Sequence, residues 1–185
     1  MITVVSGLPR SGTSLMMQML AAGGMPILSD GERRPDVDNP RGYLEWERIK
    51  QLPQQPECIA EAEGKAVKVI SRLLLSLPEG REYRVIFMRR PLLEVLTSQE
   101  VMLRNRGKSQ AADNSVVGAA FENHLREVNA WLQSKPYVKI LPVSYHELLR
   151  DAEPIARQIS EFLTVPLDAS AMAQQVDATL YRNRS

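Results

Sequence analysis

The sequence contains very little cysteine: Cys58 is the only one among 185 residues. A single thiol excludes disulfide scaffolds and cysteine-rich metal sites. The chain also lacks an excess of charge of one sign, since it has 23 basic and 22 acidic residues. This balance argues against a general role in binding nucleic acid or a membrane surface.

Long apolar runs are absent as well. No stretch approaches the ~18 apolar residues that indicate a membrane span, and the first residues have the pattern of a core strand instead of a signal peptide. We therefore expect a cytoplasmic protein without a membrane span. The length suits one domain with a sizeable core, so residues 1–185 are predicted to form a single domain.

What the sequence does contain is a glycine-bounded loop near its start. β-forming residues at 2–6 lead into Gly-Leu-Pro-Arg-Ser-Gly-Thr-Ser at 7–14, and an apolar, helix-forming run follows. This order predicts a strand, a tight loop and a helix. The backbone N–H groups of such a loop, the positive end of the helix dipole and the hydroxyls of Ser11, Thr13 and Ser14 favour an anion-binding cradle.

The loop lacks a residue that ordinary nucleotide chemistry uses. Its spacing approaches the Walker pattern G-x-x-x-x-G-K-[ST], but Thr13 stands where the lysine belongs, and the only cation in the loop is Arg10. No pair of Asp and Glu residues suggests a Mg²⁺ site, so no metal is expected. These absences weigh against ATP or GTP chemistry, and a small P-loop kinase stays open only as an alternative.

The string from Gly7 to Leu15 resembles the 5′-phosphosulfate-binding loop of sulfotransferases. These enzymes take a sulfuryl group from 3′-phosphoadenosine 5′-phosphosulfate (PAPS), and they place Lys or Arg where Arg10 stands. The resemblance implies that Arg10 is both a donor-binding and a catalytic residue; an incidental glycine-rich turn is the alternative interpretation. The donor-binding set that it implies in this loop is Pro9, Arg10, Ser11, Gly12, Thr13 and Ser14.

A second candidate anion site follows the buried strand predicted at 83–88. Arg89 and Arg90 end this strand, and Pro91 suits the first position of a helix. Arginines beside a helix N-terminus, at the carboxyl edge of a sheet, are suited to phosphate. The run resembles the sulfotransferase 3′-phosphate motif, an Arg followed eight residues later by a Ser. The spacing of eight residues to Ser98 indicates Arg90 as the motif arginine, whereas the position of Pro91 aligns better if Arg89 is that arginine. Both arginines are therefore candidates.

Two residues are candidates for acid–base chemistry near these motifs. Residues 39–45 resemble the N-P-x-G-[YF]-x-E segment of bacterial sulfotransferase-like proteins. This resemblance implies Glu45 as a general base; a carboxylate favoured at a helix start is the alternative. Lys68 matches the Lys of the K-T-H strand end of cytosolic sulfotransferases, but Ile70 stands at the position of its His. Lys68 is then a catalytic candidate or a solvated charge on an edge strand.

His124 is the second candidate base, although a lone histidine beside the apolar stripe of a predicted helix at 114–133 more often serves packing or lies at the surface. Residues 29–56 are rich in proline and glycine and are predicted to form a long loop or lid. Arg182 and Arg184 lie in a basic tail. The resemblance implies that they contact the 3′-phosphate; a solvated tail is the alternative.

Predicted strands and helices alternate along the chain, which indicates an α/β protein with three α/β/α layers around a mostly parallel sheet of four or five strands. The resemblance implies that this fold is P-loop NTPase-like and that the protein is a PAPS-dependent sulfotransferase acting on a hydroxyl or amine. A nucleotide-binding protein without catalysis is an alternative on the same scaffold. The sequence leaves the acceptor open among sugars, lipids, peptides and small phenols, and it does not indicate the oligomeric state.

Overall fold

The computed structural model describes residues 1–108 and 113–177, so the predictions for Arg182 and Arg184 lie outside the described residues. Within the described part, five strands form one sheet in the order β2-β3-β1-β4-β5. All neighbouring strands are parallel, which confirms the predicted sheet. The strands are β1 (Ile2–Gly7), β2 (Ile27–Leu28), β3 (Ala66–Lys68), β4 (Tyr83–Arg89) and β5 (Val138–Ser144).

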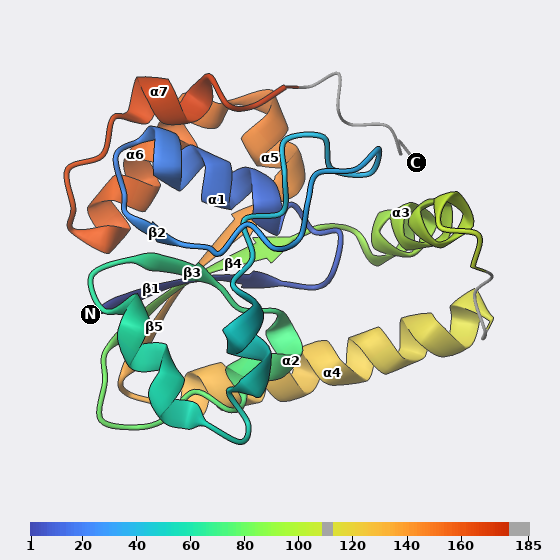
Figure 1. The fold of residues 1–185 in the computed structure, drawn as a ribbon, viewed down its shortest axis with the longest axis horizontal. Helices are drawn as coiled ribbons and strands as arrows, with labels where there is room; N and C mark the ends of the chain where they lie inside the picture. The colour runs from blue at the N-terminus through green and yellow to red at the C-terminus, as the bar shows by residue number, and fades with distance from the viewer. Residues whose placement is uncertain (109–112, 178–185) are drawn as a thin grey trace.

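Helices cover both faces of the sheet, as Figure 1 shows, so the predicted three layers are present. One face carries α1 (Thr13–Ala22), α5 (Tyr145–Arg150), α6 (Ala152–Leu163) and α7 (Ala169–Ala173). The other carries α2 (Ser71–Leu74), α4 (Asn114–Ser134) and the 3-10 helices η1 (Glu47–Gln51) and η2 (Pro56–Ala62). Helix α3 (Leu92–Asn105) lies beyond the carboxyl end of β4. No helix among the described residues is long and apolar enough to cross a membrane.

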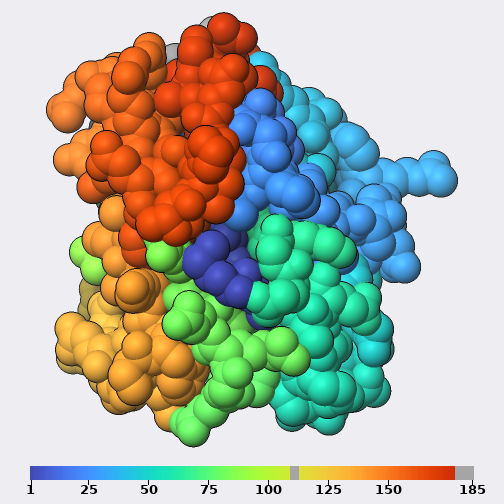
Figure 2. Space-filling model, turned by 90° about the vertical axis from the view of Figure 1, so that its left-hand side faces the viewer, coloured from blue at the N-terminus to red at the C-terminus, as the bar shows by residue number. Residues whose placement is uncertain are grey.

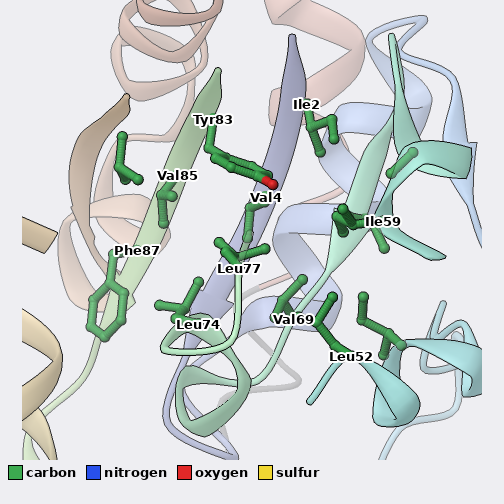
Figure 3. Packing of buried hydrophobic residues seen from close by; sticks show 14 of the residues in the cluster. Ile2, Val4, Leu52, Ile59, Val69, Leu74, Leu77, Tyr83, Val85 and Phe87 are labelled. Atoms are coloured by element: carbon green, nitrogen blue, oxygen red, sulfur yellow. The ribbon is translucent and has the colours of Figure 1, made fainter. Parts of the chain in front are cut away.

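The hydrophobic core consists of two clusters, one on each face of the sheet. Val4 and Val85 pack with Val128 of α4 in one cluster, part of which is shown in Figure 3. Val5 and Ile86 belong to the other cluster, together with residues of α1 and α6. Every residue of β1 is buried, as expected for a central strand of a parallel sheet that is covered on both faces.

The parallel arrangement separates the two ends of the molecule. Figure 2 shows the end at which the strands begin, with the dark-blue N-terminal residues in the middle of that face. The carboxyl ends of all five strands meet at the opposite edge. The loops after β1 and β4, which carry the two predicted anion motifs, therefore lie at the same edge of the sheet.

The predicted element boundaries agree closely with the structure. The helix expected to run to Arg106 ends at Asn105, and Pro91 is its N-cap residue instead of its first helical residue. The long loop predicted for 29–56 is irregular as far as Trp46, where η1 is capped. The short strand predicted near Ile27 is present as β2, on the edge of the sheet.

Candidate active site

The loop between β1 and α1 turns tightly at three positions. Gly7, Arg10 and Gly12 have φ angles of 149°, 69° and 102°. A Cβ atom at Gly12 would lie 2.5 Å from a ring carbon of Tyr145, so this close contact requires glycine. A positive φ at Arg10 costs about 1–3 kcal/mol unless surrounding contacts hold it. One such contact is the hydrogen bond from Nη1 of Arg90 to the carbonyl oxygen of Arg10, at 3.1 Å.

A pocket of about 500 Å³ lies against this loop. Its walls come from the loop itself, from residues 38–46, from the end of β3 and the start of α2, from α3 and from Tyr145. This volume falls within the range of roughly 300–1,000 Å³ that is typical of small-molecule and cofactor sites. Segments far apart in the sequence therefore form one cavity at the carboxyl edge of the sheet.

Arg10 connects the two predicted anion motifs inside this pocket. Its Nε donates a hydrogen bond to Oγ of Ser98 at 3.0 Å, and its Nη2 donates to the carbonyl oxygen of Asp38 at 3.3 Å. Burial lowers the pKa of Arg10, as does the charge of Arg90, while Tyr43 and Asp38 oppose the shift. An arginine stays protonated nevertheless, so the pocket contains a fixed positive charge at its centre.

Lys68, at the end of β3, points into the same pocket and is only 5% exposed. Its ammonium donates to the carbonyl oxygen of Tyr43 at 2.6 Å and to Oγ of Ser14 at 2.8 Å. Oε1 of Glu45 lies 3.3 Å away. Burial lowers the pKa of Lys68 to about 8, against the opposing effect of Glu45. Lys68 is thus a buried cation that can gain or lose a proton near neutral pH.

Glu45 lines the pocket beside Lys68, and two cations contact its carboxylate. Nη1 of Arg33 donates to both carboxylate oxygens, at 2.9 and 3.0 Å, in addition to the contact with Lys68. The guanidinium of Arg33 also stacks 3.4 Å from the centre of the Tyr43 ring. Ile70, which stands at the histidine position of the K-T-H pattern, is 45% exposed and lines the pocket as well.

A buried ion-pair cluster lies behind the loop. Glu94 is 2% exposed; its Oε2 accepts from Nε of Arg90 at 2.9 Å, and its Oε1 lies 2.8 Å from Nε2 of His146. The Arg90 guanidinium lies 4.6 Å from the centre of the Tyr145 ring, which packs on Gly12. Glu94 therefore supports Arg90, which in turn holds the backbone of the loop. Our sequence analysis missed Glu94, although its spacing of four residues from Arg90 on a helix was an available signal.

The segment at 33–45 is tied to the end of α3. The hydroxyl of Tyr43 donates to Asp36 at 2.7 Å, and Arg106 donates to the other oxygen of Asp36 at 3.1 Å. Asn105 donates to the Asp38 carboxylate at 2.8 Å. The contacts of Asn105 and Arg106 with this segment could not be predicted from the sequence, because no motif links positions that lie more than sixty residues apart.

Three predicted residues lie elsewhere. Ser11 is 1% exposed and, with Arg89, lines a second cavity of about 280 Å³ instead of the large pocket. His124 does not line the large pocket; its Nε2 lies 2.9 Å from Oγ of Ser71, the residue after Ile70. Burial lowers the pKa of His124. Within the described residues, no group of three or more His, Cys, Asp or Glu side chains could hold a metal ion.

Comparison with known proteins identifies what this chain is similar to. The model of the sulfotransferase domain family matches residues 2–185. The fold matches the sulfotransferase STF1 of Mycobacterium tuberculosis H37Rv with a TM-score of 0.59 and 15% identity, over 95% of this chain and 70% of that one. It also matches the sulfotransferase domain from the curacin biosynthetic pathway with a TM-score of 0.55 and 15% identity, over 95% and 77%. No curated protein sequence matches.

Proposed function

This chain belongs to the sulfotransferase domain family, and we propose that it transfers a sulfuryl group from PAPS to a hydroxyl or amine acceptor. The family assignment and the P-loop NTPase-like fold confirm our predictions of family, fold and transferase enzyme. The observation that carries the proposal of PAPS as the donor is the hydrogen bond between Arg10 and Ser98. It brings the two predicted anion motifs into one pocket, as a donor with two separate anionic groups requires.

The chemistry of the pocket fits PAPS. The loop offers backbone N–H groups and the start of α1, and the hydroxyls of Thr13 and Ser14 lie beside them in the pocket lining. Arg10 and Lys68 add positive charge on the same side. A Cβ atom at Gly7 would lie 2.8 Å from the carbonyl oxygen of Met88, so the close approach of the loop to β4 depends on glycine. We propose that these groups hold the 5′-phosphosulfate.

We propose that Arg90 and Ser98 hold the 3′-phosphate. Both line the large pocket, and Ser98 is already in contact with the charged side chain of Arg10. Arg89 is the other candidate in the sequence, but it lines only the second cavity, whereas Arg90 lines both cavities. The spacing of the motif left open whether Arg89 or Arg90 binds the 3′-phosphate, and we therefore propose Arg90.

When bound, PAPS supplies the sulfuryl group and leaves as adenosine 3′,5′-bisphosphate. Arg10 and Lys68 stabilise the negative charge that develops on the 5′-phosphate oxygen when the S–O bond breaks. Preorganised cations of this kind act without reorganisation at the moment of reaction. Lys68 can also donate a proton, since its pKa is lowered to about 8.

Glu45 is proposed as the general base that accepts the proton of the acceptor hydroxyl or amine as its oxygen or nitrogen attacks sulfur. Glu45 lines the pocket beside Lys68 and has a partly exposed carboxylate, 18% at the side chain. Its contact with Lys68 provides a route by which this proton can pass toward the leaving oxygen. His124 stays the second candidate, because its contact with Ser71 brings it to the residue that follows Ile70.

The test is a calorimetric titration of the purified protein with adenosine 3′,5′-bisphosphate and, in parallel, with ATP and Mg²⁺. We expect metal-independent binding of the bisphosphate, weakened about 10- to 100-fold by Arg10→Ala and by Ser98→Ala, because each change removes a hydrogen bond to a charged group. Preference for Mg²⁺-ATP would overturn the proposal in favour of a kinase. Bisphosphate binding without sulfuryl transfer to any acceptor in a broad screen would indicate a non-catalytic binding protein.

A further inference from the structure

The second cavity also lies against the loop between β1 and α1, and it shares Leu8 and Arg90 with the lining of the large pocket. It has a volume of about 280 Å³ and is enclosed by the loop, the end of β4 and helix α4. Its apolar wall consists of Leu8, Phe87 and Leu125, and Met88 adds a fourth apolar side chain. The polar part of its lining consists of Ser11, Arg89, Arg90 and Asn129.

Polar groups around this cavity lack partners in the protein. Oγ of Ser11 is fully buried and has no hydrogen-bond partner. Across residues 1–108 and 113–177, the side chains of Arg89 and Asn129 form no hydrogen bond or ion pair either. Buried polar side chains are paired in most native structures, because an unpaired one costs about 1–3 kcal/mol. Of these three groups only the Ser11 hydroxyl is buried, since Arg89 is exposed and Asn129 is half-buried. A buried, unpaired hydroxyl beside an arginine that no carboxylate of the described residues neutralises points to a ligand that pairs with them.

The chemistry of the lining selects an anion. Arg89 contributes positive charge, whereas the charge of Arg90 is already paired with Glu94. Ser11 and Asn129 can donate hydrogen bonds, and no acidic residue of the described chain lines the cavity. A guanidinium matches the planar geometry of carboxylate and the oxygens of phosphate or sulfate. The apolar wall suits a carbon body attached to the anionic group, and the volume limits that body to about the size of one ring.

We propose that this cavity is a second binding site beside the donor site, with which it shares Leu8 and Arg90, for a small organic anion: a carboxylate or a phosphate or sulfate monoester with an apolar body. Arg89 pairs with the anionic group and Asn129 donates a hydrogen bond to it. The Ser11 hydroxyl, which is fully buried in this structure, donates a further hydrogen bond after its side chain rotates toward the ligand. Because Ser11 belongs to the loop that we propose holds the donor, a ligand in this cavity contacts that loop from behind. Arg89 is exposed, so the cavity is reached from the solvent at that end.

The experiment is a calorimetric titration with phenyl phosphate, benzoate and inorganic phosphate, performed with saturating adenosine 3′,5′-bisphosphate so that the donor site is filled. We expect phenyl phosphate and benzoate to bind and inorganic phosphate to bind more weakly, because only the first two have an apolar body. Asn129→Leu and Arg89→Gln should each weaken phenyl phosphate about tenfold or more. Asn129→Leu should leave bisphosphate affinity unchanged.

The matched control is Arg126→Gln, which changes an exposed arginine on the same helix as Asn129; the Arg126 side chain donates a hydrogen bond to Asn123 of that helix. It should leave the affinity for phenyl phosphate unchanged. Absence of phenyl phosphate binding, or equal binding by wild type and Asn129→Leu, would overturn the inference. A loss of bisphosphate binding in Arg89→Gln would also overturn it, since Arg89 would then be the 3′-phosphate arginine.

The experiment distinguishes a failure of the second binding site from a failure of the proposed donor site. If wild type does not bind the bisphosphate, the donor proposal fails, and phenyl phosphate titrated alone still tests the second cavity. In that case a difference between wild type and Asn129→Leu supports the second site, and equal affinities overturn it. A far-UV circular dichroism spectrum and a melting curve for each variant identify any loss of fold.

Discussion

The two cavities beside the loop between β1 and α1 differ in how their polar side chains are paired. On the side of the large pocket, Arg10 contacts Ser98 and Lys68 contacts Ser14 and Glu45. On the other side, the Ser11 hydroxyl has no hydrogen-bond partner among the residues that the structure describes. The comparison shows that one loop can hold a preorganised set of cations on one face while leaving donors available on the other. Preorganisation of this kind removes part of the cost of ordering side chains when a ligand binds.

The largest effect is expected from Glu45→Gln, which removes the proposed general base from the large pocket. The amide retains the shape but cannot take the proton, so kcat should fall about 10²- to 10⁴-fold. The bisphosphate affinity should change little. The measurement is sulfuryl transfer to the best acceptor in a screen of hydroxyl and amine compounds, together with a bisphosphate titration.

The matched control for that change is Glu47→Gln, since Glu47 pairs with Lys50 and does not line the large pocket. Its turnover should equal that of wild type. If Glu45→Gln keeps wild-type turnover while His124→Gln loses it, His124 is the base and Glu45 only holds Lys68.

A second large effect is expected from Glu94→Leu, which leaves the buried Arg90 without its carboxylate partner. Breaking one partner of a buried ion pair costs about 3–5 kcal/mol, so the melting temperature should fall by about 10 °C. The bisphosphate affinity should fall too, because Arg90 holds the carbonyl oxygen of Arg10. Differential scanning calorimetry and the bisphosphate titration measure the two effects.

Glu100→Leu is the control on the same helix, since Glu100 forms an exposed ion pair with Arg104. Exposed pairs contribute about 0–1 kcal/mol, so this variant should melt within about 2 °C of wild type. Equal losses in the two variants would show that the buried cluster is no more important than a surface pair.

A smaller effect concerns pH and the charge of Lys68. Its pKa of about 8 means that the ammonium is present below this pH and is lost above it. Bisphosphate binding should therefore weaken about fivefold between pH 8 and pH 9, because the charged fraction of Lys68 in the free protein falls from about one half to about one tenth over this range. In Lys68→Arg, which stays charged, the affinity should be constant across this range.

Lys68→Met provides a second check on that prediction in case arginine does not fit the site. It should bind the bisphosphate weakly at every pH. A wild-type affinity that is constant from pH 7 to pH 9.5 would contradict the role of the Lys68 charge.

The smallest effects compare two serines of one loop. Ser14→Ala removes an acceptor of Lys68 and should cost about 1 kcal/mol of the free energy of unfolding. Ser11→Ala removes a hydroxyl without a partner, so the free energy of unfolding should stay within about 0.5 kcal/mol of wild type or rise. Urea denaturation curves measure both. A loss in Ser11→Ala as large as that in Ser14→Ala would mean that the Ser11 hydroxyl is paired in solution.

Much of the fold could be predicted because its signals are local. The β-forming run before Gly7 and the glycines around Arg10 indicate strand, loop and helix within fourteen residues, and the alternation of strands and helices indicates a parallel sheet. The spacing of eight residues from Arg90 singled out Ser98, which lines the large pocket in the structure. The position of His124 relative to the large pocket could not be predicted, because a helical stripe does not say which neighbour it packs against.

The sequence by itself determined the order of the elements, the glycine-bounded loop between β1 and α1 and the family resemblance, since each depends on residues close together in the chain. Only the tertiary structure decided which partners these residues have. Arg33 reaches Glu45, Glu94 supports Arg90, and Ser11 faces away from the large pocket. The reason is physical: contacts across a parallel sheet depend on how strands and helices pack, and this packing brings together side chains that no local pattern connects.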